Sequence, residues 1–558
     1  MSIREHALRI TLLMAFVLTV QCWMLARNTM PARDGISFIR IARDFSQTPL
    51  PTAIQRSSQH PLYPWLVSVT QRVLFLQPDS KTWLQIARGV AAAGCVLLVI
   101  PMYLTGLRLG NARTAFTAPL LFSVIPVFTR VSVDCMAESS YLLFFMIGVY
   151  GVLEFLRKEN VWWLVLAGIG SGTSYWSRPE GVILTFVMLI ALFVAPFLRS
   201  LRIRWAKVIT SGLILVMTTL LVIAPYMLLT GRMTQKNSLN HMLRKIIRAP
   251  DQVTRAAGSP VSSSVEVTVQ PSVETRPTAL SLLADDPLDF SSKHSVAGSR
   301  FQGYLPAVKE LVDELLEGFH YVFLPLALVG TMHLKEKRER LFFMTLIVVF
   351  LIALVQFSSG SGYLSTRHVI TIVCLGMYPA IEGIHVLSQK LVPFIWWLTK
   401  NRRNEDMTES RDGRKVLSLQ RKCFLVLTCV LTLFSLARSV APLHVSRQAH
   451  LKAGYWLAEQ ASDHDLLLDT RGWVSLFSGI PAYSAHGSER AFRDARLTHV
   501  VLEEEEYLAE TPRGRTFRRL LDVAGKRIGT FSVDGSPGTT VLIYRWRSER
   551  MASFWNSL

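Results

Sequence analysis

An acidic residue lies just beyond the first hydrophobic segment of the chain, in the sequence Arg33-Asp34-Gly35. It is followed by His60-Pro61-Leu62-Tyr63-Pro64-Trp65, an aromatic segment that contains two prolines. An ionisable residue close to a membrane is costly unless it serves a function, so Asp34 is the first candidate for chemistry. His60 precedes a proline and is therefore held extended, which fits either orientation of the loop or contact with a substrate.

Four other short segments hold polar residues that could act together with Asp34. Their members are Asp134 and Glu138, then Arg178 and Glu180, then Gly231, Thr234 and Lys236, and finally Arg367 and His368. A carboxylate can activate an acceptor hydroxyl or amine by taking its proton. Arginine, lysine and histidine side chains can hold an anionic phosphate leaving group. Such a set, gathered at one place, suits the transfer of a group away from a phosphate carrier.

Each carboxylate also has a purely structural interpretation. Asp34 could cap a helix or lie in solvent, as acids beside glycine usually do. Glu138 could interact only with the dipole of the helix that it begins. Asp134 could be an ordinary polar residue of a short loop.

The cations have structural alternatives as well. Arg178 and Glu180 could pair with each other and close a Pro-Gly turn. Lys236 could be an interfacial lysine whose aliphatic stem lies along the membrane. Arg367 and His368 stand where an anion would arrive, yet the start of a helix also tolerates a histidine.

The composition indicates a protein that crosses a membrane many times. The chain has 558 residues, half of them hydrophobic, with a mean hydropathy of +0.32. Several apolar runs approach or exceed the length needed to cross a bilayer. The net charge of +20 comes from short basic clusters between these runs, such as 199–207, 335–340 and 400–422. This is the positive-inside pattern of membrane proteins rather than a nucleic-acid-binding surface.

The apolar runs and the basic clusters together predict about eleven transmembrane helices, with the N-terminus in the cytoplasm. The predicted segments are 9–26, 86–107, 114–131, 138–156, 161–176, 180–198, 208–229, 317–333, 341–357, 368–387 and 422–441. The first is longer than the apolar part of a typical signal peptide, so we interpret it as a retained anchor. This topology places all the polar residues named above at the outer membrane face.

The remaining segments lie outside the membrane in this topology. The loop 27–85 holds Asp34 and His60, and its run Pro61–Leu76 has the spacing of a helix lying on the membrane surface. In the loop 230–316, residues 250–300 lack periodicity and are expected to be mobile, whereas Leu305–Phe319 has the pattern of an amphipathic helix. Residues 445–558 alternate strand and helix patterns, with strands expected at Leu466–Asp469, Thr498–Leu502, Arg527–Val533 and Thr540–Arg545 and helices near His450–Gln460 and Gly514–Leu521. We therefore expect an all-α membrane domain over residues 1–441 and a small extracytoplasmic α/β domain over 445–558.

The motifs resemble those of the GT-C superfamily of integral-membrane glycosyltransferases. The branch most similar in motif includes protein O-mannosyltransferases, lipid A aminoarabinose transferases and RgtA/B/C/D-like enzymes. The matching elements are Asp34-Gly35, His60-Pro61-Leu62-Tyr63-Pro64, Glu138, Arg178-Pro179-Glu180-Gly181, and Gly231 with Lys236. Family members often have an aromatic residue shortly after the acid, and here Phe38 would take its place.

The resemblance implies an inverting transferase that uses a polyprenyl-phosphate-linked sugar as its donor. Asp34 would be the base and Glu138 a second acid. His60, Tyr63, Arg178, Glu180, Lys236, Arg367 and His368 would bind the substrate or its phosphate. The acceptor could be a lipid, a glycan or a protein.

Other functions are compatible with the sequence. A flippase or transporter for lipid-linked sugars is one alternative, although the polar residues gather in outer loops rather than at mid-membrane. A non-catalytic envelope scaffold is another. A divalent metal is possible, yet no cluster of ligands has metal-binding spacing. The six cysteines form no disulfide framework. The topology suits a bacterial inner membrane.

Overall fold

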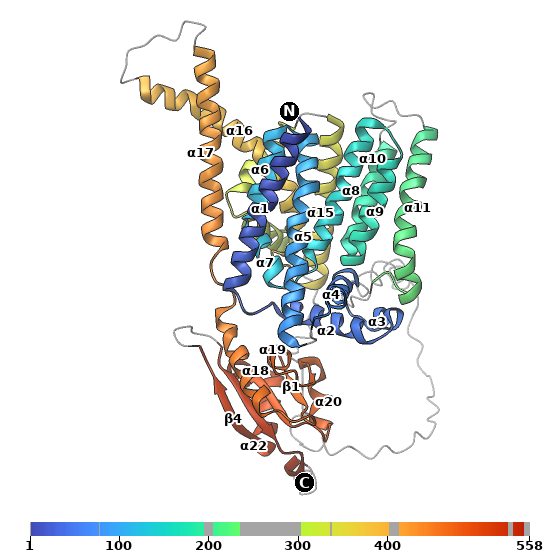
Figure 1. Ribbon diagram of the computed structural model, residues 1–558, viewed down its shortest axis with the longest axis vertical. Helices are drawn as coiled ribbons and strands as arrows, with labels where there is room; N and C mark the ends of the chain where they lie inside the picture. Colours follow the sequence, from blue (N-terminus) through green and yellow to red (C-terminus); the bar gives the residue numbers. More distant parts are fainter. Residues whose placement is uncertain are drawn as a thin grey trace, which may run out of the picture.

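The computed structural model describes residues 2–76, 79–194, 205–234, 303–334, 337–400, 412–533 and 539–551. A layer of long helices occupies one end of the molecule, and a smaller unit with a β-sheet occupies the other (Figure 1). The predicted mobile segment 250–300 lies outside the described residues. The fold class expected from the sequence, a helical membrane domain followed by an α/β region, is confirmed.

Seven helices are long and apolar enough to cross a membrane among the described residues. They are α1 (Ile3–Arg27), α5 (Ser80–Leu109), α8 (Glu138–Lys158), α11 (Trp205–Thr230), α15 (Lys337–Ser361), α16 (Ile370–Lys400) and α17 (Asp412–Ser439). An eighth span results if α6 (Ala112–Ser123) and α7 (Pro126–Val133), which meet at an angle of 59°, are taken together.

The described parts of the other three predicted spans are shorter than this length criterion. They correspond to α9 (Trp162–Ser177), to α10 (Ile183–Val194) with the 3₁₀ turn η1 (Pro179–Val182) before it, and to α14 (Phe323–Thr331). In Figure 1, α9 and α10 stand upright between α8 and α11, inside the helical layer. The count of eleven therefore describes the helical segments, whereas seven or eight meet the length of a full span.

The predicted helix 114–131 is broken in the structure. α6 ends at Ser123 and α7 begins with Pro126 in its first turn. Proline lacks the N–H needed to continue a helix and disfavours helical conformation in the residue before it. The break directs α7 along the end of the helical layer, where its residues later form one wall of the candidate site.

Residues 33–73 form short helices at the end of the layer that faces the sheet (Figure 1). They are α2 (Arg33–Gln47), α3 (Leu50–Arg56) and α4 (Leu62–Val73). The helix predicted over Pro61–Leu76 is present, whereas α2 was not predicted. Ile39, Ala42 and Phe45 are buried along one side of α2. Asp34 therefore belongs to the first turn of an amphipathic helix and not to an irregular loop.

The predicted amphipathic helix Leu305–Phe319 is observed as α13 (Tyr304–Gly318), which precedes α14. The loop between them and the short loop between α15 and α16 approach the same region as α2. Phe319 packs against Gly376 of α16, whose missing side chain leaves room for the aromatic ring.

The C-terminal region contains a five-stranded sheet in the order β2-β1-β3-β5-β4. Its strands are β1 (Leu467–Asp469), β2 (Ala482–Tyr483), β3 (His499–Glu503), β4 (Gly525–Phe531) and β5 (Val541–Trp546). β1 pairs in parallel with β2 and β3, whereas β5 pairs antiparallel with β3 and β4. The four longer strands agree with the sequence prediction; β2 was not predicted.

Helices cover this sheet and bury its apolar side chains. They are η4 (Val445–Arg447), α18 (Gln448–Gln460), α19 (Trp473–Ser478), η5 (Ala485–Gly487), α20 (Ser488–Arg493), α21 (Glu504–Leu508) and α22 (Pro512–Ala524). Leu468, Val500 and Phe517 lie in one cluster, and Leu467, Val501 and Ile543 lie in another. The alternation of neighbouring strand residues between the two clusters shows that both faces of the sheet are covered.

The loop after β1 fastens this unit to α2. The Asp469 carboxylate accepts hydrogen bonds from the backbone N–H groups of Arg471, Gly472 and Ser475 and so fixes the loop conformation. Arg40 of α2 then donates to the Ser475 hydroxyl at 2.7 Å. Trp473 donates from Nε1 to the carbonyl of Pro31 at 3.1 Å, just before α2. The C-terminal unit thus holds the helix that carries Asp34.

Candidate active site

Asp34 reaches the site because Gly35 lets α2 approach the loop between α7 and α8. A Cβ atom on Gly35 would lie 2.1 Å from the carbonyl oxygen of Asp134, far inside van der Waals contact. The chain at Asp134–Cys135 therefore passes directly against the start of α2. Glycine beside Asp34 is a packing requirement here, which gives the Asp-Gly pair a physical reason.

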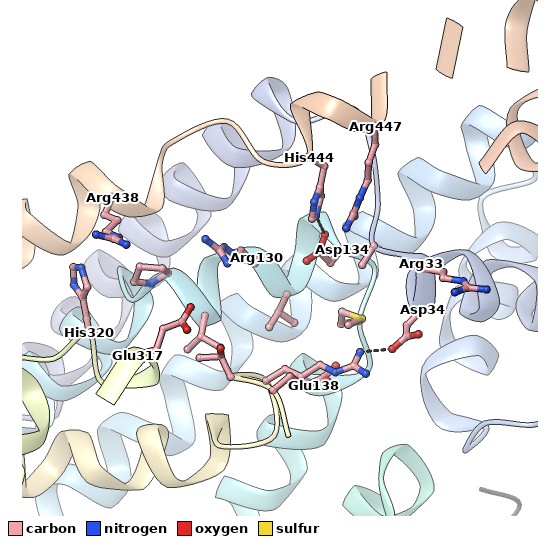
Figure 2. A pocket seen from close by; sticks show the side chains of 18 of the residues that line it. Arg33, Asp34, Arg130, Asp134, Glu138, Glu317, His320, Arg438, His444 and Arg447 are labelled. Atoms are coloured by element: carbon pink, nitrogen blue, oxygen red, sulfur yellow. Dashed lines mark hydrogen bonds and ion pairs between the residues drawn. The ribbon is translucent and has the colours of Figure 1, made fainter. Parts of the chain in front are cut away.

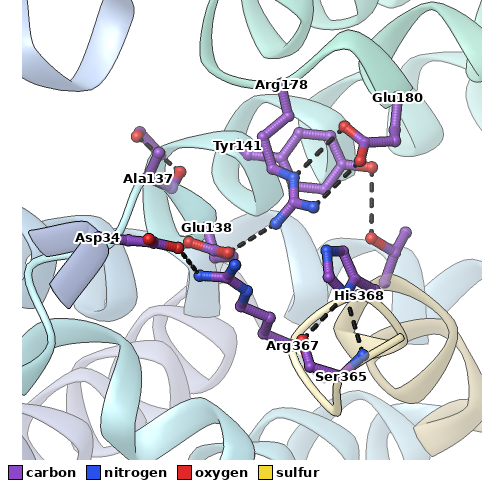
Figure 3. Close-up of polar contacts among 11 residues, drawn as sticks. Asp34, Ala137, Glu138, Tyr141, Arg178, Glu180, Ser365, Arg367 and His368 are labelled. Carbon is purple, nitrogen blue, oxygen red and sulfur yellow. Dashed lines mark hydrogen bonds and ion pairs between the residues drawn. The ribbon is translucent and has the colours of Figure 1, made fainter. Parts of the chain in front are cut away.

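The Asp34 carboxylate forms an ion pair with the guanidinium of Arg367 (Figure 3). Arg367 comes from the short loop between α15 and α16. The side chains remain 43% and 35% exposed, respectively, so a ligand can reach both partners.

A second ion-pair group lies beside the first. Arg178, between α9 and η1, donates to Glu138 at 2.6 Å and to Glu180 at 3.0 Å (Figure 3). Burial disfavours the charge on Arg178, but Glu180 and Glu138 outweigh that effect and raise the pKa of the guanidinium. Gly181 permits this turn, because a Cβ there would lie 2.4 Å from the backbone nitrogen of Tyr175. The Arg178–Glu180 ion pair considered from the sequence is present, and Arg178 also pairs with Glu138.

His368 stands on the far side of the same loop as Arg367. Its Nδ1 accepts from the Ser365 backbone N–H at 3.1 Å and lies 2.9 Å from the Ser365 hydroxyl. Thr371, one turn later, contacts the Tyr141 hydroxyl at 3.3 Å, and the Arg178 guanidinium lies over the Tyr141 ring at 5.7 Å. The loop from 362 to 369 therefore presents Arg367 toward Asp34 and His368 toward the cavity lined by Arg178.

Two cavities flank these residues. The first has a volume of about 440 Å³ and is lined by Asp34, Glu138 and Arg367 together with α7 and the chain around His444 (Figure 2). The second has a volume of about 410 Å³ and is lined by Arg178, Glu180 and His368. The Glu138–Arg178 ion pair joins them, because Glu138 lines the first cavity and Arg178 the second.

The walls of the second cavity are mainly apolar away from this polar end. They include Ile183 of α10 and Val349, Phe350, Ile352 and Phe357 of α15. Ile352 is 62% exposed, on a helix long enough to span the bilayer. A polar end and an apolar body give this cavity the character expected of a site for an amphiphilic molecule.

His60 and Tyr63 do not line either cavity in the part of the chain that the structure describes. His60 is buried, stacks on Tyr226 and contacts the Thr234 hydroxyl at 3.2 Å. Tyr63 donates to the carbonyl of Ala87 at 2.8 Å. Tyr63 also packs against Phe38 of α2, so these residues support the helix that carries Asp34. Lys236, the remaining predicted phosphate ligand, lies outside the described residues.

Several lining residues were not predicted. They are Arg33, Arg130, Glu317, His320, Arg438, His444 and Arg447. Asp134 pairs with His444 at 2.6 Å and thereby ties the chain leading to the C-terminal unit to the loop before α8. Arginines near span ends were visible in the sequence, but their convergence depends on the bend at Pro126 and on the path of the chain after α17.

No group of three or more His, Cys, Asp or Glu side chains with the geometry of a metal site occurs among the described residues. Cys135 lies beside Asp134, and burial raises the pKa of its thiol to about 12. A thiol with such a pKa is protonated at neutral pH and is a poor nucleophile.

Residues 58–226 match the dolichyl-phosphate-mannose-protein mannosyltransferase family. No curated protein sequence matches the chain significantly. The fold is similar to that of ArnT from Cupriavidus metallidurans bound to undecaprenyl phosphate, at 12% identity and a TM-score of 0.53, over 96% of this chain and 97% of that one. The chain has the fold of the GT-C glycosyltransferases.

A second GT-C structure is similar to the same extent. It is the archaeal oligosaccharyltransferase AglB from Archaeoglobus fulgidus in complex with an inhibitory peptide and a dolichol-phosphate. The identity is 13% and the TM-score 0.55, over 96% of this chain and 74% of that one. The residues that match the mannosyltransferase family include Glu138, Arg178 and Glu180, whereas Asp34 and Arg367 lie outside the matched range.

Proposed function

We propose that this protein transfers a sugar from a polyprenyl-phosphate donor to an acceptor at the outer membrane face. The observation that carries the proposal is the position of Asp34, which pairs with Arg367 in the first cavity, next to the Glu138–Arg178 pair that lies between the two cavities. A base with access to an acceptor, next to cations that can hold a phosphate, is the arrangement that glycosyl transfer requires. The family match over residues 58–226 supports the same chemistry.

The second cavity is suited to the donor. Its apolar walls on α10 and α15 can receive part of a polyprenyl chain, while Arg178 and His368 stand at its polar end. Glu138 and Glu180 both pair with Arg178 and fix its orientation before a ligand binds. The similar GT-C structures support the same type of ligand, since one is bound to undecaprenyl phosphate and another contains a dolichol-phosphate.

In the proposed step, the Asp34 carboxylate takes the proton of an acceptor hydroxyl. The acceptor oxygen forms a bond to the anomeric carbon, and the bond from that carbon to the phosphate oxygen breaks. The electron pair leaves with the polyprenyl phosphate, whose charge Arg367, Arg178 and His368 stabilise. Attack opposite the leaving group inverts the anomeric configuration. Glu138 orients Arg178 rather than contacting the acceptor directly.

The orientation of the protein follows from the charge distribution. The N-terminus and the C-terminal unit lie at opposite ends of the helical layer (Figure 1). We infer that the end with the N-terminus faces the cytoplasm, because the basic connectors lie there in the predicted topology. The site, the short helices α2–α4 and the C-terminal unit then face the outside, in keeping with a bacterial inner-membrane protein.

The test is transfer of radiolabelled sugar from polyprenyl-phosphate donors in membranes that contain wild-type protein or Asp34→Asn. We expect the variant to lose a factor of about 10²–10⁴ in rate, the usual contribution of a general base. Asp44→Asn on the same helix is the matched control, since Asp44 contacts Thr48 and lines neither cavity. Loss of less than tenfold in Asp34→Asn, or no transfer by a well-inserted wild-type protein from any donor, would contradict the proposal.

A further inference from the structure

The first cavity extends away from Asp34 along a row of arginines. Figure 2 shows Arg447, Arg130 and Arg438 spaced along one side, with Asp34 toward one end. Arg130 and Arg438 are exposed, and the guanidinium of neither has a hydrogen-bond or ion-pair partner within the described ranges. Guanidinium groups of this kind are ready to receive an oxyanion, because Arg binds phosphate and carboxylate through two parallel hydrogen bonds.

The charges that line the cavity are not balanced. Three of its four carboxylates already take part in ion pairs: Asp34–Arg367, Asp134–His444 and Glu138–Arg178. Only Glu317 then stands against Arg33, Arg130, Arg438 and Arg447 in this part of the described structure. Clefts lined by one sign of charge concentrate ligands of the opposite sign.

A buried polar group in the same wall also lacks a partner. His320 is 4% exposed and contacts the Ser435 hydroxyl through Nδ1 at 3.2 Å. Its Nε2 is buried without a hydrogen-bond partner among the described residues. Buried polar atoms are nearly always satisfied, so such an atom beside an arginine-lined cavity indicates a missing polar ligand.

The arginine row lies beside an apolar surface. Arg438 lies in the last turn of α17, and Leu433 and Phe434 of the same helix are 65% and 53% exposed. Val127 and Tyr321 also line the cavity. A molecule with an anionic headgroup and an apolar tail would place both parts favourably at this boundary.

We propose that the first cavity binds an anionic acceptor, whose phosphate or carboxylate group contacts Arg130 and Arg438 while its hydroxyl lies at Asp34. The acceptor assignment rests on the proposed transferase function, since it assigns the first cavity to the molecule that receives the sugar. The donor occupies the second cavity, and the two substrates meet beside the Glu138–Arg178 pair, which lies between the two cavities.

Binding can be measured without knowledge of the natural acceptor. The probes are dioleoyl phosphatidic acid, dioleoylglycerol as the same lipid without phosphate, and inorganic pyrophosphate as a soluble anion. Each is added to the purified full-length protein in neutral detergent, and the midpoint of thermal unfolding is recorded. We expect phosphatidic acid to stabilise the protein more than dioleoylglycerol does, and the Arg130→Gln/Arg438→Gln variant to lose that difference.

The matched control is Arg421→Gln/Lys422→Gln, which removes the same charge from the opposite part of α17. It should respond to phosphatidic acid as the wild type does. Stabilisation by pyrophosphate equal to that by phosphatidic acid would identify a soluble anion as the ligand type. Equal responses to the two lipids, with none to pyrophosphate, or an unchanged response in the Arg130/Arg438 variant, would overturn the anion site.

Transfer kinetics separate this proposal from the proposed function. Membrane extract is fractionated by anion exchange, and neutral and anionic fractions are offered as acceptors. We expect label in the anionic fraction, and a KM for that fraction raised about tenfold to a hundredfold in Arg130→Gln/Arg438→Gln with the donor KM unchanged. Transfer that depends on Asp34 but reaches only neutral products would refute the anionic acceptor alone. Absence of transfer with intact phosphatidic acid binding would refute the transferase function instead.

Discussion

Asp34 and Arg367 form an ion pair although they lie 333 positions apart in the sequence. The pair brings together the first turn of α2 and the loop between α15 and α16. Both side chains are partly exposed to solvent. Ion pairs at such positions contribute at most about 1 kcal/mol to stability. A phosphate that enters the site can therefore displace Asp34 from Arg367, and this exchange would free the carboxylate as the donor binds.

The exchange predicts the behaviour of Arg367 variants. Arg367→Gln should lower the transfer rate by about 10²–10³, the usual effect of removing one charge-stabilising donor. Arg367→Lys should retain more activity because the positive charge remains, although the bidentate geometry is lost. Steady-state kinetics with polyprenyl-phosphate-sugar donors would show the loss mainly in kcat. The control is Arg56→Gln, an exposed arginine of α3 that lines neither cavity. A variant that equals the wild type would remove Arg367 from the mechanism.

The two carboxylates around Arg178 should differ in importance. The Glu138 side chain is 6% exposed and that of Glu180 is 29% exposed. Loss of a hydrogen bond to a charged group costs more when the partner is buried, so Glu138→Gln should destabilise the protein by about 1–3 kcal/mol and Glu180→Gln by less.

Thermal unfolding of both purified variants measures which substitution destabilises the protein more. Transfer assays on the same variants then compare their rates. We expect Glu138→Gln to reduce the rate more than Glu180→Gln, because Arg178 then loses its fixed orientation at the donor cavity. A larger effect of Glu180→Gln on both measurements would show that Glu138 is not the main support of Arg178.

The general location of the site was predictable from the sequence. The alternation of apolar segments and basic clusters assigned Glu138, Arg178 and Arg367 to one face, and the structure brings these residues together. That prediction relied only on the direction in which each helix runs. It could not identify neighbours within the face, because the order of helices in the layer depends on packing between distant segments.

The errors have identifiable physical causes. α2 was missed because its intermixed arginines and aspartates obscured its buried stripe of Ile39, Ala42 and Phe45. His60 was interpreted either as a substrate ligand or as a residue that orients the loop, and its contacts with Tyr226 and Thr234 lie in a packing cluster that lines neither cavity. Local sequence contains no information about a contact such as His444–Asp134, which joins residues 310 positions apart.

Docking of the C-terminal unit should affect catalysis through α2. Burial lowers the pKa of Arg40, and the negative charge of Asp469 partly offsets this effect. The Arg40 guanidinium donates to the Ser475 hydroxyl at 2.7 Å. Arg40→Ala should therefore loosen α2 and reduce transfer, by about tenfold if one charged hydrogen bond is lost. Hydrogen exchange of α2 and α19 in the full chain measures the loosening directly.

Arg43→Ala is the matched control for this prediction. Arg43 belongs to the same helix but donates to Ser80 of the helical layer at 2.9 Å. Its loss should leave exchange in α19 unchanged. Equal protection of α19 in Arg40→Ala and wild type would show that Trp473 and Pro31 hold the unit without Arg40.

A buried carboxylate in the C-terminal unit predicts sensitivity to acid. Residues 503–506 are four consecutive glutamates, yet Glu503 is buried and paired with His450 at 3.1 Å and with Arg471. Burial opposes the charge on Glu503, yet the hydrogen bond from His450 and the charge of Arg471 outweigh it, and the pKa of Glu503 is lowered. A lowered pKa in the folded state adds stability above the pKa of the unfolded state, and that stability is lost as the pH falls through the folded value.

We therefore expect the C-terminal unit to lose stability as the pH is lowered below about 4.3, the ordinary pKa of a glutamate. Hydrogen exchange of β3 amides in the full-length protein, at pH 7 and at steps down to pH 3, measures the opening of the sheet. Glu503→Gln should be less stable at pH 7 by about 1–3 kcal/mol and should lose less on acidification, because it has no carboxylate to protonate. Glu510→Gln, at an exposed position paired with Arg518, should follow the wild-type curve. Parallel acid curves for wild type and Glu503→Gln would instead place the sensitive group elsewhere in the sheet.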